Sequence, residues 1–325
     1  MVRRRRKAIG LSIPNFSITA SRAIAGTAEK TGFDSVWVND DLVGVFQKET
    51  FDPYLCMAVM AESTRRLSVG SAVLATYRKH PVETALKLIS LDNLSRGRLI
   101  AGLGSCCPSE QWGFPAREDV NDRFAEFIAL LKRLLTSDNV HFEGEFFKVR
   151  GAGFAVRPYR GRSIPVWAAA NTDKALRTIA RVADGWLPIC IPPTIYSEEL
   201  QAVREAAEAF GRRGGEIVAG CMAFIHIDKR REMAWEKSHR LLAQTACWFN
   251  SARTRKLGLG VFKSPDQVPI DVVEKLNIVG TVEDAAARIG EYLDAGVEHL
   301  VLQPVPVEEI KAMIPRIAGA VELAR

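Results

Sequence analysis

The chain has 325 residues, of which 47% are hydrophobic and 25% charged, as in an ordinary globular protein. No apolar run is long enough to span a bilayer, and the apolar stretch near the start is too short for a secretory signal, so we expect a cytoplasmic protein without a membrane contact. The net charge of +6 comes mostly from the basic run 3–7. We interpret residues 1–7 as a segment that leads into the first strand. Nucleic-acid binding through this basic run is the alternative, but the sequence has no second basic patch to support it.

Strand-like and helix-like segments alternate along the chain. Short β-type runs predict strands over Ala8–Ile13, Ser35–Val38, Leu67–Ala72, Leu99–Leu103, Val166–Ala169, Gly185–Pro188, Ile217–Ile227 and His299–Val305. Helical patterns fit Ser17–Thr31, Pro53–Ser63, Pro81–Leu94, Asn121–Thr136, Thr172–Val182, Ser197–Phe210, Met233–Ala246, Val282–Ala295 and Val307–Leu323. Eight strands that are each followed by a helix predict a parallel sheet of the α/β class.

The pattern favours a closed (β/α)8 barrel over an open sheet. The strands are short and similar, and the GxGxxG motif that an open dinucleotide-binding sheet would carry after its first strand is missing. We treat residues 1–325 as a single domain with two insertions. Residues 139–163 contain the alternating run His141–Val149, which predicts a hairpin, and residues 248–276 are expected to form an insertion or a lid.

Small and acidic residues follow several predicted strands, at the end of a parallel barrel where active sites are built. Asp40 and Asp41 follow the second strand, and we expect one of them to exchange a proton with a substrate. Because neighbours along an extended chain point opposite ways, only one of the two is expected to face the site, and a solvated loop pair is the alternative. Gly104, Ser105 and Cys106 follow the fourth strand, and glycine lets a flat ligand approach the backbone closely.

Four segments resemble the luciferase-like monooxygenase superfamily, and in particular its branch that uses the deazaflavin coenzyme F-420. They are AEKTGFDSVWVND, VGSAVLATYRKHPVETALKLISLDNLSRGRLIAGLGS, IPVWAAANTDKALRTIARVADGWLP and NIVGTVEDAAARIGEYLDAGVEHLVLQP. The resemblance implies a TIM barrel with insertions that binds the deazaflavin, or alternatively FMN, at the carboxyl ends of its strands. It also implies a homodimer or a higher homo-oligomer.

The resemblance assigns roles to residues around this opening. The strand that ends at Ser71 resembles the family's bulge, with a non-prolyl cis peptide at Ala72–Val73 behind the cofactor ring. The expected cofactor-binding residues are Asp40, Ser71, Ala72, Val73, Gly104, Ser105, Cys106, Ala169, Ala170, Asn171, Gly185 and Trp186. Asn171 precedes a helix whose first N–H groups can hold a phosphate, and it is equally a helix N-cap. Asn15, Phe16, Trp112 and Phe249 are expected to wall a substrate pocket, and no spacing of histidines predicts a metal site.

The expected activity is hydride transfer between coenzyme F-420 and a small organic substrate, which is pterin-like, an alcohol or ketone, or a conjugated alkene. The similarity extends to methylenetetrahydromethanopterin reductases in VWVNDD and in the GLGS loop. The chain has Asp41 where many relatives carry histidine, and Cys107 where they often carry an acidic residue, which speaks against sugar-phosphate oxidation. An FMN-dependent two-component monooxygenase and a non-catalytic flavin-binding protein are the alternatives.

Overall fold

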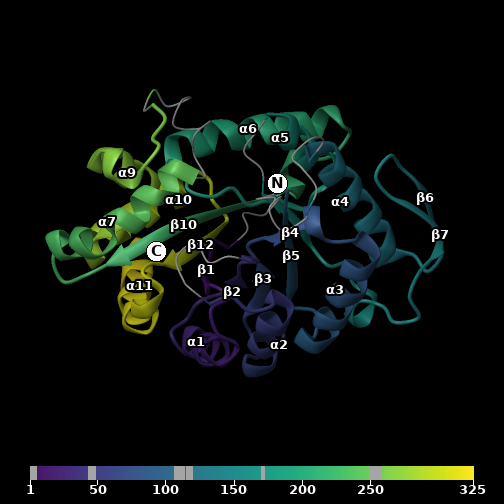
Figure 1. Cartoon of the computed structure of the whole chain (residues 1–325), viewed down its shortest axis with the longest axis horizontal. Helices are drawn as coiled ribbons and strands as arrows, with labels where there is room; N and C mark the ends of the chain where they lie inside the picture. Colours follow the sequence, from purple (N-terminus) through teal and green to yellow (C-terminus); the bar gives the residue numbers. More distant parts are fainter. Residues whose placement is uncertain are drawn as a thin grey trace.

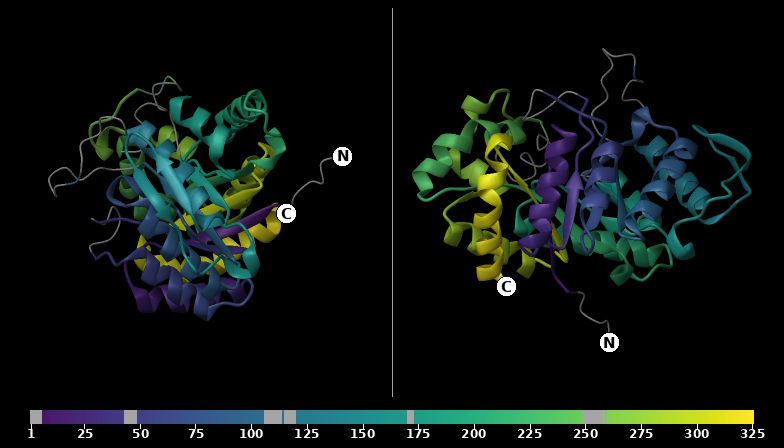
Figure 2. Two further views of the ribbon diagram at one scale, coloured as in Figure 1. Left: turned by 90° about the vertical axis from the view of Figure 1, so that its right-hand side faces the viewer. Right: turned by 90° about the horizontal axis from the view of Figure 1, so that it is seen from below.

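The computed structural model of the chain describes residues 6–42, 49–105, 114, 120–169, 173–248, 258 and 260–325. Parallel strands close into a barrel, and helices pack around its outside (Figure 1). The first described residue, Arg6, and the last residue, Arg325, both pair with Asp34, so β1 begins near the end of the last helix (Figure 2). None of the helices in the described ranges has both the length and the apolar character that crossing a membrane requires.

Eight parallel strands of the described chain form the barrel wall, in the order β12, β1, β2, β3, β5, β8, β9 and β10, and the pairing of β10 with β9 closes the ring. They are β1 (Ala8–Ser12), β2 (Ser35–Val38), β3 (Ser68–Ser71), β5 (Leu99–Gly104), β8 (Val166–Ala169), β9 (Gly185–Trp186), β10 (Val218–Ile227) and β12 (His299–Pro304). Each corresponds to one strand predicted from the sequence, so the predicted barrel is confirmed. Two short strands were not predicted: β4 (Leu74–Ala75), which pairs with β5, and β11 (Ile278–Gly280), which pairs with β10.

Apart from α9, which was not predicted as a helix, the helices lie where the sequence pattern places them, with differences of a few residues at their ends. They are α1 (Ile18–Lys30), α2 (Pro53–Ser63), α3 (Pro81–Ser95), α4 (Val120–Thr136), α5 (Asp173–Val182), α6 (Pro193–Ala209), α7 (Arg231–Trp248), α9 (Ile270–Leu276), α10 (Val282–Asp294) and α11 (Ile310–Ala324). Local signals explain the accurate ends. The Asp52 side chain accepts from two N–H groups of the first turn of α2, and Pro53 occupies the first helical position.

Two tryptophans and a histidine fill the amino-terminal part of the barrel. The ring centroids of Trp37 and Trp167 are 5.3 Å apart, and the His299 ring lies 5.4 and 5.2 Å from them. Glycines on neighbouring strands make room for the indoles. A Cβ on Gly70 would lie 2.4 Å from Trp37, and one on Gly185 would lie 2.6 Å from Trp167. The side chains of Trp37, Trp167 and His299 therefore close the barrel interior below the opening at the carboxyl ends of the strands, and we call them the floor.

A short hydrogen-bond chain links this floor to the barrel wall. The Trp37 indole N–H donates to Ser35 Oγ at 2.7 Å, and Ser35 Oγ lies 2.7 Å from His299 Nε2. Burial lowers the pKa of His299 to about 4, so the imidazole is neutral near pH 7.

The described parts of the two predicted insertions lie outside the barrel wall. The first contains the expected antiparallel hairpin, formed by β6 (Val140–Glu143) and β7 (Lys148–Ala152). The Glu126 carboxylate of α4 accepts hydrogen bonds from three backbone N–H groups of the hairpin turn, which fastens the hairpin to the body. The second contains α9, and its role as a lid remains a prediction.

Candidate active site at the carboxyl ends of the strands

One wall of the barrel opening is made of backbone and very small side chains. Ser71 Oγ donates to the Gly102 carbonyl at 2.8 Å, and it accepts from the Gly102 N–H at 3.1 Å. The Ala72–Val73 peptide bond that follows is cis, which confirms the position predicted from the resemblance. A Cβ on Gly102 would lie 1.8 Å from the Ser71 carbonyl oxygen and 3.6 Å from Val73 Cγ1, so the bulge rests directly on β5.

The wall continues along β5 and β8. Gly104 ends β5 and pairs in register with Ala169, which ends β8. The Thr76 hydroxyl fixes this edge because it donates to the Gly104 carbonyl at 3.0 Å. Ser105 comes next and is half-buried, as is Ala169. The strand ends at Ala72, Gly104 and Ala169 therefore offer a surface without long side chains, which suits the face of a flat ring.

Asp40 lies behind this wall in a buried cluster of charges. Its side chain is 4% exposed and pairs with the Lys79 ammonium at 2.5 Å and with the Arg78 guanidinium. Asp40 also accepts from the Ala75 N–H at 3.0 Å. Burial lowers the pKa of Lys79. For Arg78, burial also acts to lower the pKa, but the combined interactions with Asp40 and Tyr77 outweigh it and raise the pKa overall. Asp40 is thus held between two cations, and it joins the end of β2 to the segment that follows β4.

Asp41 has a different environment from that of its neighbour. It is half-buried, and its carboxylate accepts from the Asn39 side-chain amide at 2.8 Å. Asn15 is fully buried, and its side-chain amide donates to the Asp41 carbonyl at 3.0 Å and to the Phe51 carbonyl at 2.8 Å. Asn15 therefore ties two loops of the opening together. The two carboxylates do point to different surroundings, as expected from their adjacent positions.

Two residues predicted to bind the cofactor have other contacts. Gly185 packs against the Trp167 ring inside the barrel, so the absence of its side chain serves the floor. Trp186 is fully buried and stacks on Tyr196 of α6 at 5.1 Å, on the outer face of the wall. The Trp186 side chain thus faces away from the barrel interior, because alternate residues of a strand face opposite sides, and its contact with the cofactor stays a prediction.

Several predicted residues lie outside the described ranges, and others have modest roles. Phe16 is half-buried and packs against the core near the end of β1. The residues outside the described ranges are Cys106, Cys107, Trp112, Ala170, Asn171 and Phe249. The expected phosphate site before α5 and most of the expected substrate pocket remain predictions.

Sequence reasoning missed four side chains that shape the opening. Arg78 and Lys79 are the partners of Asp40, and Ser12 and Gln303 form a buried hydrogen bond between β1 and β12. Arg78 and Lys79 lie six and seven residues after the predicted strand Leu67–Ala72, in the loop that leads to the next helix, and this position was a usable signal. The pairing of Ser12 with Gln303 joins residues at opposite ends of the chain, and only the closed barrel brings them together.

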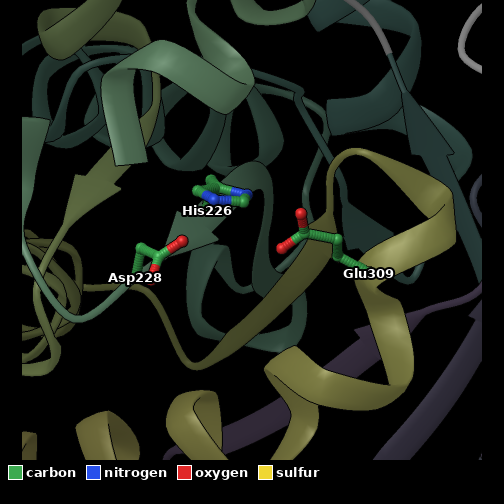
Figure 3. Close-up of side chains that lie close together, drawn as sticks. All are labelled: His226, Asp228 and Glu309. Carbon is green, nitrogen blue, oxygen red and sulfur yellow. The ribbon is translucent and has the colours of Figure 1, made fainter. Parts of the chain in front are cut away.

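A second polar cluster lies at the ends of β10 and β12. His226, Asp228 and Glu309 have ligand-type atoms within 4.8 Å of one another, and Figure 3 shows the two carboxylates flanking the histidine. The Lys237 ammonium lies 2.7 Å from Asp228 and 3.2 Å from Glu309. His226 uses Nδ1 to donate to the Val305 carbonyl at 2.6 Å. A metal ion would have to displace the ammonium, so we interpret this cluster as an ion-pair network.

A groove of about 610 Å³ lies on the outside of the barrel. Its lining comes from the outer helices and includes Pro193 of α6, Lys275 of α9, and Arg288 and Glu291 of α10. These residues are remote from the bulge and from the aspartates. We therefore assign the groove no part in the chemistry of the opening.

Comparison with known proteins agrees with this geometry. The chain is 32% identical over 287 residues to an F-420-dependent glucose-6-phosphate dehydrogenase of Amycolatopsis mediterranei, a match that covers 84% of this chain and 85% of that protein. The solved structure of the coenzyme F-420-dependent tetrahydromethanopterin reductase of Methanopyrus kandleri superposes with a TM-score of 0.83 at 20% identity, over 96% and 97% of the two chains. An F-420-dependent secondary alcohol dehydrogenase, solved with an F-420–acetone adduct, superposes with a TM-score of 0.84 at 18% identity, over 98% and 99% of the two chains.

These structural likenesses establish the fold, and a match over residues 4–299 establishes the family. The matched range contains the bulge, the glycine loop and both aspartates. It follows that the chain belongs to the luciferase-like monooxygenase family.

Proposed function

We propose that the protein is an oxidoreductase that transfers a hydride between coenzyme F-420 and a small organic substrate. The observation that carries this proposal is the wall formed by the strand ends at Ala72, Gly104 and Ala169, which presents only backbone and small side chains, as a surface for a flat ring requires. The F-420-dependent relatives support the choice of a deazaflavin. Unpaired polar atoms at the opening, among them the buried Gln303 Nε2, also fit a site built to receive a polar ligand.

The residues of the site divide into holding and proton-moving groups. The segment Ser71–Val73 and Gly104 would support the ring, and Ser105 would offer a hydroxyl group to it. When bound, the coenzyme supplies the chemistry of hydride transfer. Asp40 is clamped by two cations and would keep the β2 loop in place against the wall. Asp41 is the carboxylate that we propose for proton exchange with the substrate.

The proposal is tested by titrating the purified protein with coenzyme F-420 and, separately, with FMN. We expect coenzyme F-420 to bind with a change in ring fluorescence and FMN to bind more weakly. Ala169→Leu places a branched side chain on the wall and should weaken binding at least about tenfold. Ala23→Leu, on the exposed face of α1, is the matched control and should leave binding unchanged.

The outcomes separate the candidate functions. Binding of FMN alone would favour the two-component monooxygenase, and binding of neither ring would refute the proposal. Tight binding without turnover on any substrate would favour a non-catalytic flavin-binding protein. Since Asp41 replaces the histidine of many relatives, the first substrates to test are alcohols, ketones and conjugated alkenes rather than sugar phosphates.

We also propose that the enzyme is a cytoplasmic homodimer. Cys56, Cys190, Cys221 and Cys247 form no disulfide with another described residue, as expected in a reducing compartment. Leu55 on α2 is 55% exposed, and Leu86 on α3 is 43% exposed. Apolar side chains on neighbouring outer helices suit a contact with a second copy. Leu55→Glu combined with Leu86→Glu should halve the mass measured by light scattering, and an unchanged mass would contradict this interface.

A further inference from the structure

A buried glutamine on β12 has a polar atom without a partner. Gln303 is 1% exposed, and the fully buried Ser12 donates from Oγ to Gln303 Oε1 at 3.2 Å. Gln303 Nε2 has no hydrogen-bond partner among the described residues. Turning the amide over would let Nε2 donate to Ser12, but it would then leave Oε1 alone. Either orientation leaves one polar atom of a buried amide without a hydrogen bond, which lowers the stability of the folded protein.

Strand geometry directs this amide toward the barrel axis. His299 lies inside the barrel, because its ring contacts Trp37 and Trp167. Residues two and four positions further along β12 share its face, so Val301 and Gln303 also point inward. Four residues correspond to about 13 Å along a strand, which carries Gln303 from the aromatic floor to the opening.

The amide lies across the barrel from the wall of small residues. In the closed ring of eight strands, β5 lies four strands from β12, so Gly104, the last residue of β5, and Gln303, the next-to-last residue of β12, lie on opposite strands. Next to Gln303 lie Phe224 in register on β10 and Ser12 on β1. A flat ring held on the β3–β5–β8 wall would thus turn its other face toward Gln303.

We propose that Gln303 is a substrate-binding residue, and that its amide, oriented by Ser12, donates a hydrogen bond to a carbonyl or hydroxyl oxygen of the substrate. This inference rests on the proposed function, since the coenzyme ring defines which side of the opening is left for the substrate. Phe224 and Met222, at 2% and 4% exposure, make the surroundings apolar. A neutral oxygen suits such a place because burying a charge there would be far more costly.

The first test needs no ligand. Gln303→Met combined with Ser12→Ala removes both the amide and the buried hydroxyl that donates to it. Because no polar atom of the pair is then left unpaired, the double variant should raise the melting temperature of the free protein by about 2–4 °C. A structural role for the amide predicts the opposite sign, and a lowered melting temperature would overturn the proposal. Gln201→Met is the matched control: Gln201 is exposed on α6, where it donates to Glu205 at 2.7 Å, and its replacement should leave the melting temperature unchanged.

The second test uses coenzyme F-420 with acetone, cyclohexanone and 2-propanol as probes. Gln303→Met should bind the coenzyme as well as the wild type does, yet lose about 10–100-fold in kcat/KM. Ser12→Ala should raise KM without changing coenzyme affinity, because the serine acts through the glutamine. Equal kcat/KM in the Gln303→Met variant and the wild type would overturn the proposal.

Different results would refute the proposed function and the proposed role of Gln303. A wild-type protein that does not bind coenzyme F-420 would refute the proposed function, while the stability test would still report on the amide. A wild-type protein that binds the coenzyme but converts none of the three probes would refute the assignment of a neutral carbonyl or hydroxyl ligand. A retained kcat/KM in Ser12→Ala would refute the orienting role of the serine.

Discussion

The Asp40 cluster makes the most demanding prediction about the site. Asp40→Asn keeps the shape of the side chain and removes its charge. The variant leaves Lys79 and Arg78 without their counter-ion, and these side chains are only 15% and 7% exposed. Removing one partner of a buried ion pair costs about 3–5 kcal/mol. Because Lys79 can lose its proton, we expect the lower end, about 3 kcal/mol near pH 7.

The pH dependence of this effect has a definite sign. Burial already lowers the pKa of Lys79 from its ordinary value of 10.5, and the loss of Asp40 lowers it further. Between the lowered folded pKa and 10.5, the unfolded chain binds more protons than the folded chain, so stability rises with pH. Asp40→Asn should therefore recover part of its lost stability as the pH increases from about 7 to about 9.

The assay is guanidinium unfolding followed by tryptophan fluorescence at both pH values. Adding Lys79→Met to Asp40→Asn should restore more than half of the loss, because it removes the stranded charge. Glu83→Gln is the matched control: its partner Lys87 is 44% exposed, and the loss should be only about 0.3 kcal/mol. If Asp40→Asn costs no more than Glu83→Gln, the reasoning about this cluster is wrong.

Three further predictions concern the floor and the hairpin. Gly70→Ala puts a methyl group 2.4 Å from the buried Trp37 ring and should lower the free energy of unfolding by about 1–3 kcal/mol. Gly290→Ala has open space around the new methyl group on α10 and should raise the free energy of unfolding by about 0.5–1 kcal/mol. Chemical unfolding of both variants checks these opposite signs. Since the pKa of His299 is lowered from 6.5 to about 4, acidification through that range should cost about 3 kcal/mol, and a stability–pH profile unchanged in His299→Gln would contradict this. Glu126→Ala should speed limited proteolysis in the β6–β7 hairpin while leaving the unfolding midpoint nearly unchanged, and equal cleavage rates would refute the anchoring role.

Features that depend on neighbours along the chain were predictable from sequence. Apolar runs bounded by turn residues located all eight barrel strands, and α2 was placed to the residue because Asp52 and Pro53 are local start signals. The cis bond at Ala72–Val73 was also located, but through the resemblance of the segment rather than through any propensity of alanine or valine.

Features that depend on closing the barrel were not predictable. Trp186 turned outward although its segment matched a cofactor loop, because the register with β8 places Gly185 on the inner face. Arg78 and Lys79, the partners of Asp40, lie nearly forty positions later in the chain. The sequence alone does not show whether they pair with Asp40 or with another carboxylate.

By itself, then, the sequence determined the order of strands and helices and the kinds of residue that reach the opening, since both follow from hydrogen bonding and side-chain alternation within short segments. The tertiary structure decided which side chains share a contact. Ser12 meets Gln303 across 291 positions of sequence only because β1 and β12 become neighbours when the sheet closes. A contact between distant segments depends on register and closure, and these are properties of the whole barrel rather than of either strand.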